Sequence, residues 1–444
     1  MTRCRGLVLA APASSCGKTT IALGLLRMLA RKGARVQPAK SGPDYIDTGF
    51  LAAAGRRPAL NLDAWAMTGS ELLHLAGGAG QVAGGADTLI AEGAMGVLDG
   101  AGPGRAGSAA SLAEHLGVPV VLVLDVSGQA DSAILPVLGL RSALPSLELA
   151  GVILNCLASR RHEQLVRAAM DRSGIRVLGG LAKSAGLTLP SRHLGLVPAA
   201  EHPHIEELME STADAVEDGV DVGALLAAAA PIRMPEGQPV TPPSIPPLGQ
   251  RISIARDQVF AFVYEHVLQE WSQQGAGLSF FSPLAGESPA DDCDAVFLPG
   301  GYPELHAEAL SNAEGFRCGM QAAAARQAVI YGECGGYMVL GKTLADRDGQ
   351  RFPMLGLLPH ATTFARPKLH LGYRLLRAER GAPLQGSFAG HEFHYSSHDG
   401  DGTGRPMFTA RDADGNSLGG TGQFIGSVGG SYVHLICRDR RHHR

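Results

Sequence analysis

Residues 8–20 read VLAAPASSCGKTT, an apolar run that passes through a loop of small residues into GKTT. The next residues, TTIALGLLRMLARKG, carry apolar side chains at helical spacing, so the loop is expected between a strand and a helix. In that setting backbone N–H groups cradle phosphates, a lysine reaches the terminal phosphate and a hydroxyl holds magnesium. The segment therefore predicts a nucleotide-binding phosphate loop, with Lys18 and Thr19 in these two roles.

The loop departs from the strict pattern at one position, because Pro12 stands where a glycine is usual. A plain small-residue turn between strand and helix is the alternative interpretation. The intact GKTT and its strand-to-helix setting favour the phosphate loop. The residues expected to contact ATP here are Pro12, Ser14, Ser15, Cys16, Gly17, Lys18, Thr19 and Thr20.

Short β-branched runs alternate with amphipathic stretches through the first half of the chain, which predicts a parallel sheet with crossover helices. This pattern fails in the proline-rich segment 231–250, which leaves no room for a helix or a central strand. A second α/β series then begins at RISIARD. With 444 residues, the chain is predicted to be an α/β protein with domains at 1–230 and 251–444, joined by a linker at 231–250.

Composition excludes several classes of protein. The 7 cysteines form no C-x-x-C pair, which argues against a disulfide framework or a zinc site. A net charge of −4 without a long basic tract argues against nucleic acid as a partner. No apolar run is long enough to cross a membrane, and the N-terminal run fits a strand better than a signal peptide, so a cytoplasmic protein is expected.

Two acidic residues follow predicted strands and could complete a magnesium shell around the phosphates. These are Asp44 in KSGPDYIDTGF and Glu92 in LIAEGAMGVLDG. Helix capping or simple solvation is the alternative for an acid at a strand end. Lys40 could add positive charge near a transferring phosphoryl group, and the side-chain amide of Asn155 could contact the nucleotide base.

A second centre is indicated by AVIYGECGGYMVLG, where Cys334 lies within G-x-C-x-G between a strand and a helix. Such a turn exposes a nucleophile, and the N–H of Gly335 can stabilise an oxyanion. The helix N-terminus is expected to lower the pKa of the thiol. A buried structural cysteine is the alternative, and the surrounding glycines favour the nucleophile.

Two further segments would complete this centre. Gly300 and Gly301 end a predicted strand, and the backbone N–H of Gly301 could form the other half of the oxyanion hole. His434 in SYVHLI is the best candidate for the base, although a lone histidine in an apolar strand is more often structural.

The stretch GHEFHYSSH suggests a metal site through His391, His394 and His398. If this stretch is a strand, His391 and His394 face opposite sides, so a shared metal is disfavoured.

Eight ordered segments, among them APASSCGKTT, KSGPDYID, AEGAMGVLDG, LPGGYPELH, ECGGYMVLG and GHEFHYS, resemble the cobyrinic and hydrogenobyrinic acid a,c-diamide synthases over nearly the whole chain. The resemblance implies an N-terminal ATPase domain similar to dethiobiotin synthetase and a C-terminal triad-type glutaminase domain. It also implies an enzyme of cobalamin biosynthesis that uses glutamine, ATP and magnesium to amidate the a and c acetate carboxylates of a corrin ring through an acyl phosphate.

The resemblance implies a role for individual residues. Cys334 is the nucleophile on glutamine and His434 its base, and the residues implied to bind ATP and magnesium are Lys18, Thr19, Asp44 and Glu92. The residues expected to meet the corrin substrate are Tyr45, Asp47 and Asp99. The wider triad glutaminases carry a glutamate two residues after the histidine, but Ile436 stands here, so the third member of the site is unnamed.

Two rival functions stay open at this stage. Cobyric acid synthase shares the two-domain plan but amidates other side chains, and a partitioning-type ATPase switch would carry an inactive glutaminase domain. The GPDYID and GHEFHYS segments favour the diamide enzyme over the first, and the intact Cys334 and His434 argue against the second. The sequence does not decide whether the ring carries cobalt, with a slight preference for the metal-free ring, and it leaves open the oligomeric state, with a homodimer as one option.

Overall fold

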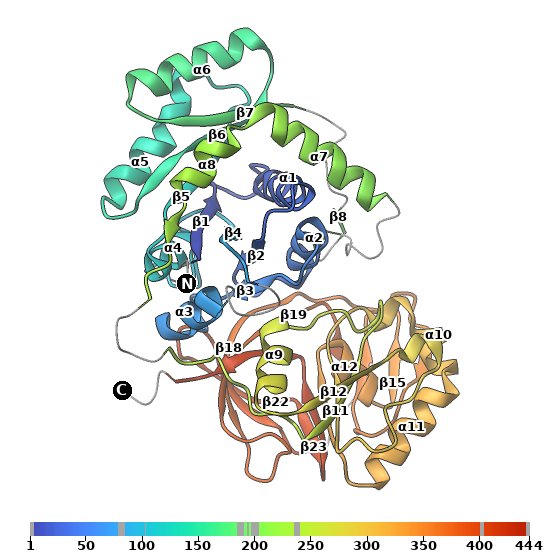
Figure 1. The fold of residues 1–444 in the computed structure, drawn as a ribbon. Coiled ribbons are helices and arrows are strands. Elements are labelled where there is room, and N and C mark those ends of the chain that lie inside the picture. Colours follow the sequence, from blue (N-terminus) through green and yellow to red (C-terminus); the bar gives the residue numbers. More distant parts are fainter. Residues whose placement is uncertain are drawn as a thin grey trace. The chain divides into compact units, whose positions relative to one another are not determined.

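A computed structural model of the chain describes residues 4–78, 85–102, 104–183, 191–192, 195–196, 204–234, 240–399 and 404–440. The chain divides into two compact units, Met1–Pro242 and Pro243–Arg444 (Figure 1). Each unit is described by itself below. Among the described residues, no helix has both the length and the apolar character that crossing a bilayer requires.

Unit 1 is built on a sheet whose central strands run parallel in the order β3-β2-β4-β1-β5-β6-β7. Its strands are β1 (Arg5–Ala10), β2 (Val36–Ser41), β3 (Leu60–Leu62), β4 (Thr88–Glu92), β5 (Val120–Asp125), β6 (Leu149–Leu157) and β7 (Val177–Ala182). The short strands β8 (Ser191–Arg192) and β9 (Gly195–Leu196) pair with each other, and β10 (Ala230–Pro231) pairs antiparallel with the start of β1.

The helices of unit 1 cover both sides of this sheet. They are α1 (Lys18–Arg31), α2 (Tyr45–Gly55), α3 (Gly69–Gly78), α4 (Ala109–Leu116), α5 (Leu135–Ala143), α6 (Arg160–Arg172), α7 (Ile205–Gly219) and α8 (Val222–Ala228). Figure 1 shows α1, α2 and α7 on one side of the strands and α4 and α5 on the other. Coverage of both faces explains why β1 and β5 read as continuous apolar runs.

The parallel arrangement places the predicted nucleotide residues at one edge of the sheet. The carboxyl ends of parallel strands point the same way, and ligands of open α/β sheets bind there. β4 lies between β1 and β2, with Leu9 in register with Glu92 and Lys40 in register with the same residue on the other side. The phosphate loop after β1 therefore lies beside Lys40 and Glu92.

The division between the units, at Pro242 and Pro243, lies inside the proline-rich segment 231–250. One detail differs from the sequence expectation, because Pro231 ends the strand β10. A proline is tolerated there because the pairing is only two residues long, and the next ladder bond comes from the N–H of Ile232 to the carbonyl of Cys4.

The described residues of unit 2 form three sheets, ordered β12-β11-β13-β14-β24-β23, β16-β15-β17-β20 and β22-β21-β18-β19-β25. The first sheet comprises β11 (Arg251–Ala255), β12 (Gly277–Phe281), β13 (Ala295–Leu298), β14 (Val329–Glu333), β23 (Gln423–Ile425) and β24 (Val428–Ser431). The second comprises β15 (Thr343–Ala345), β16 (Arg351–Pro353), β17 (Ala361–Thr363) and β20 (Ser397–His398). The third comprises β18 (His370–Ala378), β19 (Ser387–His394), β21 (Phe408–Arg411), β22 (Ser417–Thr421) and β25 (Val433–Arg438).

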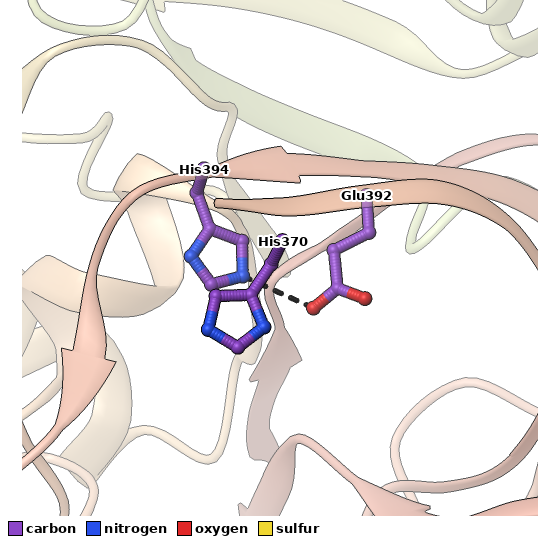
Figure 2. A group of neighbouring side chains, drawn as sticks. All are labelled: His370, Glu392 and His394. Atoms are coloured by element: carbon purple, nitrogen blue, oxygen red, sulfur yellow. Dashed lines mark hydrogen bonds and ion pairs between the residues drawn. The ribbon is translucent and has the colours of Figure 1, made fainter. Parts of the chain in front are cut away.

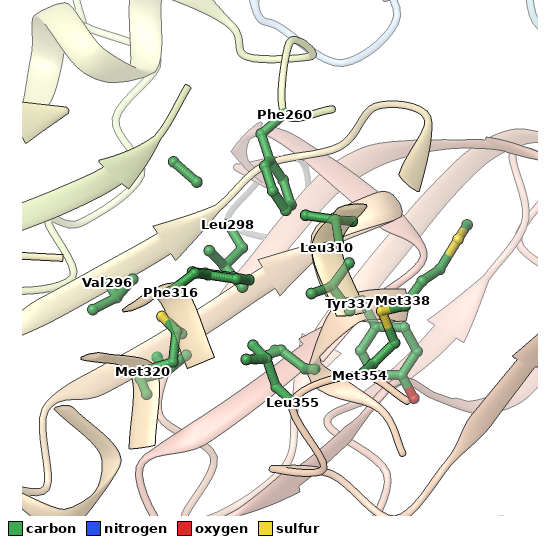
Figure 3. Close-up of a cluster of buried hydrophobic side chains, with 14 of the residues drawn as sticks. Phe260, Val296, Leu298, Leu310, Phe316, Met320, Tyr337, Met338, Met354 and Leu355 are labelled. Atoms are coloured by element: carbon green, nitrogen blue, oxygen red, sulfur yellow. The ribbon is translucent and has the colours of Figure 1, made fainter. Parts of the chain in front are cut away.

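The helices of unit 2 are α9 (Glu265–Gln273), α10 (Ala307–Asn312), α11 (Glu314–Ala325) and α12 (Gly335–Leu340). Figure 3 shows the hydrophobic core in which Val296 and Leu298 of β13 contact side chains from α10 and α11, including Leu310 and Phe316. This core extends to Tyr337 and Met338 on α12. It fixes the short helix that follows Cys334 against the sheet.

Candidate active sites

The phosphate loop of unit 1 is shaped by Gly17 and Asn155. Gly17 caps α1 with a φ of 88°, a left-handed conformation that favours glycine. A Cβ at this position would overlap the side-chain amide of Asn155, whose Nδ2 donates a hydrogen bond of 2.9 Å to the carbonyl of Cys16. The contact that the structure gives Asn155 is therefore with the loop backbone, whereas the sequence suggested a contact with the nucleotide base.

Lys18 lies across the loop and is only 7% exposed. Its Nζ donates to the carbonyl of Ala13 at 3.2 Å and to that of Met95 at 2.6 Å. Burial lowers the pKa of this amine, and the nearby Glu92 partly offsets the effect. The loop residues Pro12, Ser14 and Ser15 are exposed, which leaves the outer side of the loop open to a ligand.

Glu92 joins Thr19 and Lys40 in one buried cluster. Its Oε1 accepts hydrogen bonds from the Thr19 hydroxyl at 2.5 Å and from Lys40 Nζ at 3.1 Å. Lys40 Nζ also pairs with Asp47 Oδ2 at 2.5 Å. Burial favours the neutral amine of Lys40, but the carboxylates of Glu92 and Asp47 outweigh it and raise the pKa of this lysine. The cluster therefore holds the charged amine of Lys40 beside the phosphate loop, paired with the carboxylates of Glu92 and Asp47.

The residues of this cluster fit a magnesium ion. Glu92 is 1% exposed, and within the described part of the chain its Oε2 has no hydrogen-bond partner. A buried carboxylate oxygen without a partner costs free energy, and hard cations take carboxylate and hydroxyl oxygens as ligands. Thr19 and Glu92 are therefore the residues that suit magnesium.

Asp44 has a different contact from the one expected for a magnesium ligand. Its Oδ1 accepts the N–H groups of Ile46 and Asp47, both at 2.8 Å, and so caps α2. Helix capping was the alternative that the sequence left open. The carboxylate nevertheless lies near the cluster, because its charge contributes to the raised pKa of Lys40.

The three residues expected to meet substrate lie around the same edge. Tyr45 begins α2 and is partly buried. Asp47 is the partner of Lys40, and Asp99 is exposed and accepts the N–H of Gly96 through Oδ2 at 2.9 Å. Asp47 is thus engaged inside the cluster, whereas Asp99 faces solvent.

Cys334 of unit 2 lies in a sharp turn between β14 and α12. Its φ of 45° and ψ of −106° are unusual for a residue other than glycine. Its N–H donates to the carbonyl of Ser431 at 2.9 Å, which ties the turn to β24. A Cβ on Gly336 would overlap the carbonyl of Leu298, so only glycine lets the turn approach β13 this closely. This is the strained strand-to-helix turn that the G-x-C-x-G pattern predicts.

The expected partners of Cys334 surround the same turn. A Cβ on Gly335 would lie 3.0 Å from the backbone nitrogen of Gly301, so the two amide groups are neighbours. A Cβ on Gly300 would overlap the imidazole of His434. His434 and the turn of Cys334 therefore flank the same Gly300–Gly301 pair.

One expectation about the thiol is wrong. Cys334 is 3% exposed, and burial, together with the charge of Glu304, raises the pKa of the thiol. The N–H of Gly335 acts in the opposite direction but is outweighed. The helix that follows is only 6 residues long, which limits the stabilisation of a thiolate. The resting form is therefore the protonated thiol, and attack requires a base.

His434 is suited to be that base. It is 2% exposed, and burial, helped by the charges of His391 and His394, lowers its pKa to about 3. The imidazole is therefore neutral at physiological pH and has a lone pair that can take a proton, but the lowered pKa makes it a weak base, so the transfer must be coupled to attack on the amide. Its Nδ1 lies 3.7 Å from Oε2 of Glu333, a residue that the sequence reasoning did not select. The one feature of the sequence that could have indicated Glu333 is its position directly before Cys334, at the end of an apolar strand.

A group of histidines and a carboxylate forms in the third sheet of unit 2 (Figure 2). His370 pairs with His394 across β18 and β19, and their rings stack at 4.7 Å with an angle of 9° between planes. Glu392 accepts from His394 Nε2 at 3.0 Å and from Arg374 Nε at 2.7 Å. Two parallel rings do not direct their nitrogen lone pairs at one point, and both oxygens of Glu392 already bind His394 and Arg374. This geometry does not suit a shared metal ion. The arrangement is an ion-pair network on the wall of a cavity of about 910 Å³.

The local sequence pattern had suggested a different set of histidines, namely His391, His394 and His398. β19 includes both His391 and His394, so these two side chains face opposite sides of the sheet. His394 instead shares a face with Glu392 and, through the strand register, with His370. The pairing of β18 with β19, which brings in His370, was not visible in the local pattern.

Comparisons with known proteins find a family match for each unit of the chain. Residues 7–197 match the model of the CobQ/CobB/MinD/ParA nucleotide binding domain, and residues 251–442 match the CobB/CobQ-like glutamine amidotransferase domain. The hydrogenobyrinate a,c-diamide synthase of Brucella abortus is 48% identical over 97% of this chain and 98% of its own. The chain belongs to the hydrogenobyrinate a,c-diamide synthase family.

Further members of this family match over the same extent. The proteins of that name from Rhizobium meliloti and Rhodobacter capsulatus are 47% and 49% identical, each over 97% of this chain and over 99% and 98% of their own. The family confirms the predicted fold class, a nucleotide-binding α/β domain followed by a glutamine amidotransferase domain. It also confirms the resemblance to the a,c-diamide synthases that the sequence motifs indicated.

Proposed function

We propose that this chain converts the a and c acetate carboxylates of hydrogenobyrinic acid into amides, using ATP and the amide nitrogen of glutamine. The observation that carries the proposal is the presence of two intact reaction sites in one chain. Unit 1 has a phosphate loop with Lys18 and the Thr19–Glu92 pair, and unit 2 has Cys334 in a nucleophile turn beside Gly300–Gly301 and His434. Relatives of this name that match over 97% of the chain support the choice of substrate.

In unit 1 a carboxylate oxygen of the ring attacks the γ-phosphorus of ATP, ADP leaves, and an acyl phosphate forms. This reaction depends mainly on positioning and charge. Lys18 and Lys40 offset the phosphate charge, and Gly17 lets the loop backbone approach the phosphates. Magnesium, which Thr19 and Glu92 would hold, supplies further positive charge at the phosphates when bound.

In unit 2 the sulfur of Cys334 attacks the amide carbon of glutamine. His434 takes the thiol proton, and the N–H groups of Gly301 and Gly335 stabilise the oxyanion. The proton then passes to the departing nitrogen, ammonia leaves, and water hydrolyses the thioester to glutamate. Ammonia attacks the carbonyl carbon of the acyl phosphate, phosphate leaves, and the amide is formed. A neutral base is required because the buried thiol keeps its proton at rest.

The test is the variant Cys334→Ala. We expect it to lose amide synthesis with glutamine and to keep synthesis with ammonium chloride, because only the nitrogen supply has been removed. Cys318→Ala is the matched control, since Cys318 is an exposed cysteine of the same unit. Glutamine-dependent synthesis by Cys334→Ala, or loss of both activities, would contradict the two-site scheme.

The metal state of the ring is measured in the same assay. The relatives carry the name of the metal-free acid, so we expect hydrogenobyrinic acid to be amidated with a higher kcat/KM than cobyrinic acid. Equal or reversed values would assign the chain to the cobalt-containing substrate instead.

A further inference from the structure

The position at which a carboxylate was expected beside the catalytic histidine is occupied by hydrocarbon. Ile436, two residues after His434, is fully buried, and its carbonyl accepts a hydrogen bond of 2.8 Å from His266 Nε2. Within the described residues, the carboxylate that reaches the imidazole comes from β14. Glu333 Oε2 lies 3.7 Å from His434 Nδ1.

The fold holds this carboxylate firmly in place. Glu333 is the last residue of β14, pairs with Ser431 of β24, and is 5% exposed. Its Oε1 accepts the N–H of Leu435 at 3.0 Å, so the same carboxylate is bonded to the backbone next to His434. One side chain thus fixes the start of β25 with one oxygen and faces the ring of His434 with the other.

We infer that Glu333 is the positioning carboxylate of the Cys334–His434 pair, contributed by the residue immediately before the nucleophile. This inference rests on the proposed glutaminase activity of unit 2. Glu333 Oε2 faces Nδ1 of His434 at 3.7 Å, and its negative charge favours the tautomer that carries the proton on Nδ1, so that Nε2 takes the thiol proton. After that transfer the imidazolium is stabilised by the adjacent carboxylate. Glu333 thus acts on the reaction through His434.

The charge state of Glu333 gives the inference a measurable signature. Burial raises the pKa of this carboxyl to about 8, although the N–H of Leu435 acts to lower it. The other titratable groups around the pair are Tyr331 on the same strand, Glu304 and Tyr432 near Cys334, and His391, His394 and Glu392 on β19. Because the productive form has an ionised carboxylate beside a neutral imidazole, glutaminase activity should rise as the pH passes through about 8.

The experiment compares three variants of the full-length chain. Glu333→Gln keeps the size and removes the charge, Glu333→Asp keeps the charge on a shorter side chain, and Glu308→Gln controls for loss of an exposed carboxylate of the same unit. Initial rates of glutamine hydrolysis are measured from about pH 6 to about pH 10, which covers about two pH units on each side of the expected pKa of Glu333. Synthesis with ammonium chloride is measured in parallel.

For Glu333→Gln we expect kcat for glutamine hydrolysis to fall by about 100-fold, the scale seen when an orienting or stabilising charge is lost. KM should change little, and the rise near pH 8 should disappear. Glu333→Asp should recover part of kcat together with a rise near the same pH. A kcat within about threefold of the parent, or an unchanged pH profile, would overturn the inference.

Loss of the fold is tested separately. Labelling of Cys334 by iodoacetamide, with chemical denaturation as a reference, reports whether unit 2 is folded in each variant. If Glu333→Gln is unfolded, the ¹⁵N chemical shifts of His434 in the parent protein decide instead. At a pH above about 8, the Nδ1–H tautomer is expected, and the Nε2–H tautomer would overturn the inference. Cys334→Ala separates a failure of the proposed glutaminase activity from a failure of the role inferred for Glu333, because it tests the glutaminase activity and leaves Glu333 unchanged.

Discussion

Gly300 determines where the imidazole of His434 can lie, so Gly300→Ala tests the site by displacing the base. A Cβ at this position would lie 3.0 Å from Nε2 and would overlap Cε1 of the ring. The backbone of Gly300 is not in the left-handed region, so alanine adds no conformational strain of its own. The perturbation is therefore a methyl group pressed against the edge of the imidazole.

The size of the effect follows from that contact. The added Cβ would lie 2.2 Å from Cε1 of the ring. Carbon atoms in van der Waals contact are about 3.5–4.0 Å apart, so the ring must retreat by about 1.3–1.8 Å. A displacement of this size between a catalytic group and its partner can cost about 100-fold in rate. Because His434 is buried on all sides, the displaced ring also strains its neighbours. An additional loss of stability of about 1–3 kcal/mol is expected from overpacking.

The assay is glutamine hydrolysis beside ammonium-dependent synthesis. We expect kcat for hydrolysis to fall about 100-fold in Gly300→Ala, with ammonium-dependent synthesis retained. Gly277→Ala is the matched control, because a Cβ there meets only the carbonyl of Gln250 at 3.7 Å. If Gly300→Ala hydrolyses glutamine as fast as Gly277→Ala, His434 is not the base, and the geometric reasoning fails.

Two further predictions concern other parts of the chain. Gly17→Ala should weaken nucleotide binding at least about tenfold, because a left-handed alanine costs about 1–3 kcal/mol and its Cβ would collide with Asn155. Calorimetric titration beside Gly139→Ala, whose Cβ would meet open space, checks this. At Glu392, hydrogen bonds and charges from His394 and Arg374 outweigh the effect of burial and lower the pKa of the carboxyl from 4.5 to about 2. The ionised carboxylate therefore stabilises the folded state by about 3 kcal/mol above pH 4.5. Glu392→Gln should therefore lower the free energy of unfolding at pH 7. The gap to the parent should close as the pH falls from 4.5 toward 2, and a gap independent of pH would contradict the shift.

The fold was predictable where local pattern and topology agree. VLAAPASSCGKTT specifies a strand, a turn that needs Gly17 and a helix, and the structure has β1, the left-handed Gly17 and α1 in that order. The G-x-C-x-G segment likewise specified β14, the turn at Cys334 and α12. These features depend on residues adjacent in the chain, so a single sequence contains the information for them.

The side-chain partners depended on long-range register and were less predictable. Asp44 could be a ligand or a helix cap until the start of α2 was known, because the same residue type serves both. Asn155 lies about 140 residues from the loop that it supports. The pKa of Cys334 was misjudged because the local pattern shows the helix after it but not the burial and the carboxylates around it.

The placement of Glu333 next to the nucleophile resolves an apparent conflict in the charges of this site. An ionised carboxylate beside Cys334 would oppose formation of a thiolate, and Glu333 does contribute to the raised pKa of the thiol. A permanent thiolate–imidazolium pair is therefore unfavourable here. The same burial raises the pKa of Glu333 to about 8 and lowers that of His434 to about 3, so the resting site at neutral pH contains little charge. Most of the charge then appears when the thiol proton moves to His434. Where Glu333 is ionised, its carboxylate 3.7 Å away stabilises the imidazolium, and this ionised fraction grows as the pH rises through about 8. A site of this kind keeps its nucleophile inactive until a proton transfer is coupled to attack on the amide.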